Sequence, residues 1–112
     1  MRVTFVQSGG FVGAVKGCAI DAADLAPGER QELESLVAAS GLTESSELFS
    51  GPGRDLRQYD IVIEHDAAVQ RLSCDERSVP EAARPLLTFL FSRARPQPPG
   101  FADRVRRPDA DG

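Results

Sequence analysis

The sequence predicts an α+β protein in which a four-stranded antiparallel sheet carries two helices on one face. Short segments with apolar residues at alternate positions come in pairs, and each pair is followed by a segment with apolar residues at helical spacing. The predicted order is therefore ββαββα. Because the strands alternate between apolar and polar positions, one sheet face should carry both helices and the other should meet water.

The first half of the chain contains the first hairpin and the first helix. In residues 2–7, Val3 and Phe5 alternate with Thr4 and Val6 as in a strand, and residues 14–20 have the pattern of an antiparallel partner. Pro27 suits the first turn of a helix, where its missing N–H has no partner to lose. Gly41 is typical of the residue after a helix, so we expect a helix between these two residues.

The second half begins with an irregular segment, residues 42–55, which is rich in serine and glycine. Residues 57–65 carry the clearest strand pattern of the chain. A tight reversal at residues 66–67 joins them to a partner strand over residues 69–74.

The second helix contains a proline within its apolar pattern. Helical spacing returns after Pro80, but Pro85 falls inside it and has no N–H to donate. We therefore expect an irregular turn at residues 80–84 and a helix from residue 85 to near residue 94.

Length and composition bound the class of protein. A chain of 112 residues predicts one domain, which we place at residues 1–95, followed by a flexible tail rich in proline and arginine at residues 96–112. The net charge of −4 argues against nonspecific nucleic-acid binding as the main task. There is no apolar run of membrane-spanning length and no signal-peptide pattern, so we expect a cytoplasmic protein, monomeric when free.

Residues suited to catalysis or metal binding are sparse. His65 is the single histidine, and Cys18 and Cys74 lack the paired short spacings of zinc sites. We therefore expect no enzyme, no metal and no cofactor. Each cysteine falls in a predicted strand as a small buried hydrophobe, reduced in the cytoplasm, although a disulfide between them is an alternative. Four scattered acids most simply form a solvated surface: Glu44, Glu47, Asp55 and Asp60.

The connection between the first two strands is the most distinctive segment. We call residues 8–13 the Gly-rich loop: Ser8, Gly9, Gly10, Phe11, Val12 and Gly13. Glycine adopts positive φ at little cost, so this segment can turn sharply or let another chain approach closely. An exposed phenylalanine on such a loop would offer an apolar anchor to a partner's pocket. The alternative is a hairpin turn whose Phe11 folds back onto the core.

The opening residues 2–13, RVTFVQSGGFVG, resemble the start of the emfourin family, small bacterial proteins that inhibit protealysin-like metallopeptidases of the thermolysin family. Further stretches also resemble that family: DAADL at 21–25, RQYDI at 57–61 and VPEAARPLL at 79–87. The resemblance spans about residues 1–91 and implies a partner with a zinc-bearing cleft. We expect the Gly-rich loop to enter that cleft, with Phe11 as its apolar anchor.

A second candidate contact is the Gly-Pro-Gly segment, residues 50–56, with Gly51, Pro52, Gly53 and Arg54 as interface residues. The order of elements allows this segment to lie at the opposite end of the sheet from the Gly-rich loop, and a plain solvent loop is the alternative. A rival function is a non-inhibitory interaction or regulatory module that uses the open sheet face or the basic tail.

Overall fold

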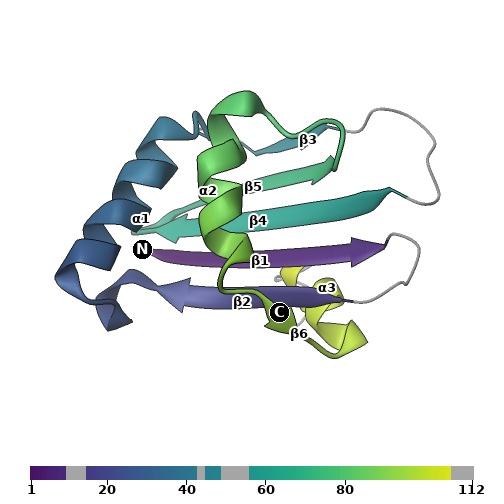
Figure 1. Ribbon diagram of the computed structural model, residues 1–112, viewed down its shortest axis with the longest axis horizontal. Helices are drawn as coiled ribbons and strands as arrows, with labels where there is room; N and C mark the ends of the chain where they lie inside the picture. Colours follow the sequence, from purple (N-terminus) through teal and green to yellow (C-terminus); the bar gives the residue numbers. More distant parts are fainter. Residues whose placement is uncertain (10–14, 43–44, 49–55, 107–112) are drawn as a thin grey trace.

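The computed structural model describes residues 1–9, 15–42, 45–48 and 56–106 (Figure 1). Its strands are β1 (Arg2–Gly9), β2 (Lys16–Asp21), β3 (Ser46–Leu48), β4 (Arg57–His65), β5 (Ala68–Asp75) and β6 (Arg95–Pro96). Its helices are α1 (Pro27–Ala39), α2 (Arg84–Phe91) and α3 (Pro99–Arg106), with short 3-10 turns η1 (Ala22–Asp24) and η2 (Glu81–Ala83).

The strands form one sheet in the order β3-β5-β4-β1-β2-β6. All neighbours are antiparallel except β3 and β5, which are parallel. The predicted α+β class is confirmed, and the four expected strands are the four central ones. The strand count and the ββαββα order were wrong, because β3 and β6 add a short strand at each edge and α3 follows the second helix. Strands of three and two residues are too short to show a period-two pattern.

The helix boundaries follow the local signals of the sequence. Helix α1 begins at Pro27 and ends at Ala39, and Gly41 follows with a φ of 74°. The irregular turn before the second helix is η2, and α2 carries Pro85 in its first turn, where no N–H is needed. Helix α2 ends at Phe91, earlier than expected. None of the helices in the described ranges has the length and apolar character that a bilayer crossing requires.

Helices α1 and α2 cross one face of the sheet, which we call the helix face (Figure 1). Alternate residues of the central strands point into this layer and meet apolar side chains from both helices. The largest fully buried side chains there are Phe5, Leu33, Ile61, Ile63, Leu72, Leu86 and Leu90. This layer is the main core of the protein.

Helix α3 packs on the opposite face, which we call the second face. Ala102 and Val105 contact Val6 and Val62 there, with Phe101 beside them. We expected this face to meet water and residues 96–112 to be a flexible tail. Residues 95–106 instead form β6 and α3 against the sheet, and residues 107–112 lie outside the described residues. The few apolar side chains of this segment give little signal among its prolines and arginines.

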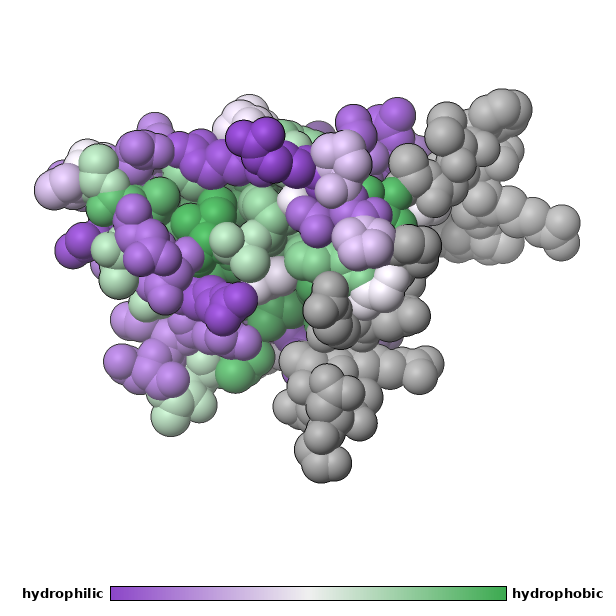
Figure 2. Space-filling view, turned by 90° about the horizontal axis from the view of Figure 1, so that it is seen from below, coloured by the Kyte–Doolittle hydropathy of each residue, from purple (hydrophilic) through white to green (hydrophobic). Residues whose placement is uncertain are grey.

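Strand β6 runs along part of the β2 edge. Lys16 is in register with Pro96, and Gly17 with Arg95. From the side of β2 and β6, hydrophobic surface is gathered in the middle of the molecule with hydrophilic side chains around it (Figure 2). The C-terminal segment therefore contributes to both an edge and a face of the sheet.

The two cysteines are free and lie on different strands. Strands β1 and β4 separate β2, which carries Cys18, from β5, which carries Cys74. That separation is roughly 14 Å, twice the limit of about 7 Å between the Cα atoms of a disulfide. Burial raises the pKa of the Cys18 thiol, and Arg93 partly opposes this shift. Burial, with the carboxylates of Asp60 and Asp75, raises the pKa of Cys74 to about 11.

Gly17 lies where a side chain has no room. A Cβ there would overlap the backbone oxygen of Phe5 and lie 2.6 Å from Cε2 of Phe101. We expect Gly17→Ala to lower the free energy of unfolding by about 1–3 kcal/mol, as overpacking does. Gly28→Ala is the matched control, because nothing lies within 4 Å of its Cβ position. Urea unfolding of both variants measures the difference, and equal stabilities would contradict this account of Gly17.

The raised pKa of Cys74 makes stability depend on pH in the alkaline range. The unfolded thiol ionises at its ordinary value of 9.0, whereas the folded thiol keeps its proton to about pH 11. The stabilisation from this thiol is therefore complete below pH 9 and is lost as the pH rises towards 11. Cys74→Ala should show a shallower loss of stability in urea unfolding over this range. Parallel pH profiles for the variant and the parent would refute the shift, since Tyr59 and Cys18 titrate in both proteins.

Candidate functional site

The described base of the Gly-rich loop is the end of β1. Gly9 has a φ of 76° and is in register with Arg57 of β4. A Cβ at Gly9 would lie 3.2 Å from the carbonyl oxygen of Leu56, so both the backbone conformation and the space favour glycine. Ser8 is only 7% exposed and therefore packs within the sheet at the base of the loop. Gly10, Phe11, Val12 and Gly13 lie outside the described residues.

The Gly-Pro-Gly segment leaves the sheet at the same end. Gly51, Pro52, Gly53 and Arg54 lie outside the described residues, but both flanks of the segment are described. Arg57, one residue after the segment, pairs with Gly9. On the other flank Leu48 is in register with Cys74, and through Tyr59 with Gln7. The opposite-end placement was therefore wrong, because both flanks lie at the sheet end where β1 ends: Arg57 is directly beside Gly9, and Leu48 is three strands away from β1 (Figure 1).

Three aromatic rings pack together on the helix face near this end. The ring of Phe91 lies 5.3 Å from Phe5 and 5.4 Å from Tyr59 between centroids, in edge-to-face geometry with both. Phe5 is fully buried, whereas Phe91 is 38% exposed. Phe91 was not among the residues expected at the site. Its position four residues after Leu87 on α2 was the signal that placed it against the sheet.

Hydrogen bonds fix the start of β4, where the Gly-Pro-Gly segment rejoins the sheet. The backbone N–H of Arg57 donates to Oε1 of Glu76 over 3.1 Å, and the N–H of Glu76 donates to the carbonyl oxygen of Arg57 over 3.0 Å. Burial raises the pKa of Tyr59, Glu76 adds to the shift, and Arg57 opposes it through its charge and a hydrogen bond. The phenol therefore keeps its proton at physiological pH.

A buried carboxylate lies on the second face of the same strands. Asp60 is 2% exposed, and it accepts hydrogen bonds from Oγ of Ser73 at 2.6 Å and Nε2 of Gln58 at 3.3 Å. We expected Asp60 on a solvated surface, and that expectation was wrong. The alternation of β4 places Asp60 between Val6 and Ser73 in register, inside the sheet layer. Its bonded oxygens make it a structural group.

The histidine and the two cysteines considered as catalytic or metal-binding candidates do not come together in the structure. His65 is exposed at the β4–β5 turn, 4.0 Å from Oδ2 of Asp66. Both cysteine thiols are protonated at neutral pH because burial raises their pKa. Within the described ranges no group of three or more His, Cys, Asp or Glu side chains is placed to hold a metal ion. Among the described residues, this end of the sheet presents the backbone of Gly9, the partly exposed ring of Phe91 and the exposed residues Arg57 and Glu76.

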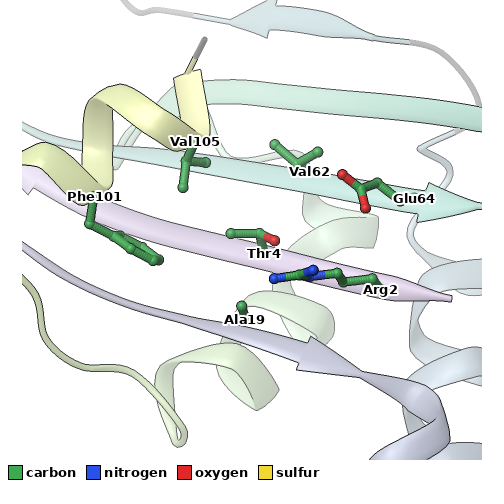
Figure 3. Close-up of a pocket in the computed structure, with 7 residues that line it drawn as sticks. All are labelled: Arg2, Thr4, Ala19, Val62, Glu64, Phe101 and Val105. Carbon is green, nitrogen blue, oxygen red and sulfur yellow. The ribbon is translucent and has the colours of Figure 1, made fainter. Parts of the chain in front are cut away.

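A cavity of about 340 Å³ lies on the second face beside α3 (Figure 3). Thr4, Ala19, Val62, Phe101 and Val105 form its apolar side, with Arg2 and Glu64 beyond them. Arg2 and Glu64 are register partners at the start of β1, so the cavity extends away from the Gly-rich loop. It is therefore separate from the candidate site.

The comparison with known proteins bears on this end of the sheet. A family model described as Emfourin matches residues 5–91, from β1 to the last residue of α2. No curated protein and no solved structure gives a significant match. The match therefore includes the whole Gly-rich loop, residues 8–13, and the Gly-Pro-Gly segment, residues 50–56. It also includes β2 to β5 and β1 from Phe5 onward. Because it spans most of the chain, this protein belongs to the emfourin family, a family of inhibitors.

Proposed function

We propose that this protein inhibits a bacterial protealysin-like zinc metallopeptidase of the thermolysin family by placing the Gly-rich loop in the active-site cleft. Membership of the emfourin family carries this proposal. The location of the loop supports it, because β1 is a central strand and delivers Gly9 to the sheet end with a backbone conformation that favours glycine.

The loop blocks the cleft with backbone and one large side chain. Phe11 fills an apolar pocket of the peptidase, and the glycines let the chain lie close to the cleft wall in a curve that resists cleavage. Ser8 is buried, so it supports the loop from beneath rather than contacting the peptidase. The contact residues within the loop are therefore Gly9, Gly10, Phe11, Val12 and Gly13.

The Gly-Pro-Gly segment belongs to the same interface. Its C-terminal flank lies beside the base of the Gly-rich loop through the pairing of Gly9 with Arg57. One partner seated on this end of the sheet therefore meets both segments, and Gly51, Pro52, Gly53 and Arg54 supply a second contact. Variation in this segment changes the choice of peptidase without changing the anchor.

The alternative use of the second face as a regulatory surface has less support. Helix α3 already covers Val6 and Val62, and β6 pairs with the adjacent edge. The segment proposed as a binding tail therefore packs on its own sheet through Phe101, Ala102 and Val105 of α3. A cytoplasmic location and a monomeric free state are part of the proposal.

Removing the anchor should weaken inhibition strongly. We expect Phe11→Ala to reduce affinity about 30- to 1000-fold, the equivalent of about 2–4 kcal/mol for a desolvated aromatic anchor. Val69→Ala is the matched control: Val69 is 50% exposed and lies in register with Glu64 at the other end of the sheet. Titration of a thermolysin-family peptidase with each variant gives the inhibition constants. A folded Phe11→Ala protein that inhibits as well as the parent would eliminate the anchor.

The peptidase should keep its zinc in the complex. The inhibitor has one histidine and two cysteines, and Cys18 and Cys74 are held on separate strands with protonated thiols. Occlusion of the cleft therefore accounts for inhibition better than metal capture. We expect metal analysis of the purified complex to give one catalytic zinc per peptidase, and activity to return on dissociation without added zinc. Recovery of metal-free peptidase would refute occlusion.

A further inference from the structure

The C-terminal segment beyond the emfourin match forms hydrogen bonds to β2, the strand that follows the Gly-rich loop. We call residues 95–106, comprising β6 and α3, the C-terminal arm. The backbone N–H of Gln97 donates to the carbonyl oxygen of Val15 over 2.8 Å, and its Nε2 donates to the carbonyl oxygen of Gly17 over 3.0 Å. Val15 is the first described residue after the loop, so one arm residue bonds the backbone on both sides of Lys16.

Helix α3 fixes the arm to the centre of the sheet. The ring of Phe101 lies against Gly17, where a Cβ would come within 2.6 Å of Cε2. Ala102 and Val105 then pack on Val6 of β1 and Val62 of β4. The N–H of Phe101 donates to the carbonyl oxygen of Pro98 over 2.9 Å, which closes the turn between β6 and α3. The start of β2 is thereby tied to the two central strands.

The two ends of the loop depend on different neighbours. At the first end, Gly9 belongs to β1, which has β2 and β4 as partners. At the second end, the outer side of β2 is bonded by β6 and Gln97. Without the arm, that side of β2 would be an open edge at the point where the chain leaves the loop.

We propose that Gln97 and Phe101 are positioning residues for the Gly-rich loop. They fix the position and direction of the chain at Val15, and so they limit the conformations that the loop samples. This proposal rests on the proposed inhibitory function for its consequence: a loop held in one shape loses less entropy on binding and is a poorer substrate for the peptidase. The arm thus sets inhibitor strength without contacting the peptidase.

Limited proteolysis tests the positioning role of Gln97 and Phe101 without any reference to inhibition. Chymotrypsin cleaves after phenylalanine, and mass spectrometry identifies the nick after Phe11. Gln97→Pro removes both donors, and we expect nicking to become about tenfold faster, as the loss of two hydrogen bonds implies. Gln97→Glu keeps the shape but loses the donor to Gly17, so we expect a few-fold increase. Arg95→Ala is the matched control, because that side chain is exposed on the same arm.

The folding controls keep this test decisive. Circular dichroism and thermal unfolding establish that each variant retains the sheet, and Phe101→Ala loosens the arm without a new proline in case Gln97→Pro does not fold. Equal nicking rates in the parent, Gln97→Glu and Phe101→Ala would overturn the proposal. Faster nicking in Arg95→Ala as well would also overturn it, since that variant keeps both Gln97 donors.

Titration against a thermolysin-family peptidase tests the consequence. We expect the Gln97→Pro variant to inhibit about tenfold less well than the parent and to be cut slowly within the Gly-rich loop by the peptidase. If the parent does not inhibit, the proposed function fails while the chymotrypsin result stands. If Phe11→Ala abolishes inhibition but Gln97→Pro inhibits like the parent and stays uncut, the positioning role fails and the proposed function stands.

Discussion

Strand β1 is the constraint on which the rest of the structure depends, because it is bonded on both sides and buried on both faces. Val3 and Phe5 point into the helix face, and Val6 points under α3, each with no exposed surface. A strand in this position cannot shift its register by one residue without moving apolar side chains out of both layers. The place where β1 ends is therefore fixed, and with it the point at which the Gly-rich loop leaves the sheet.

Much of this arrangement could be predicted from side-chain periodicity. The four central strands and both helices on the helix face have patterns long enough to identify, and Pro27, Gly41 and Pro85 mark their ends or irregularities. The elements that the sequence did not predict, β3, β6 and α3, depend on contacts between residues far apart in the chain. Helix α3 packs because Gly17 leaves space for Phe101, and no local pattern in the C-terminal segment contains that information.

At the candidate site, too, the local features could be predicted from the sequence, whereas the contacts between strands could not. A glycine at position 9 is what a φ of 76° requires, and sequence composition is sufficient to indicate such a site. The proximity of the Gly-Pro-Gly segment required the register of β1 against β4, in which Gly9 meets Arg57. The burial of Ser8 and Asp60 also depended on the register and on what covers the second face. Polar residues in an alternating strand are expected at the surface only when the face they share stays open.

The contact between Gln97 and Gly17 joins residues 80 positions apart. During synthesis β1, β2 and the Gly-rich loop emerge first, while the residues that hold β2 from outside emerge last. The loop therefore passes through a period in which it is attached to a growing chain and lacks its outer support. A nascent chain, or one that terminates before Gln97, would carry every residue of the emfourin match but would lack the hydrogen bonds that Gln97 donates to Val15 and Gly17. If the C-terminal arm positions the loop as proposed, a chain gains its full inhibitory strength only when its translation is complete.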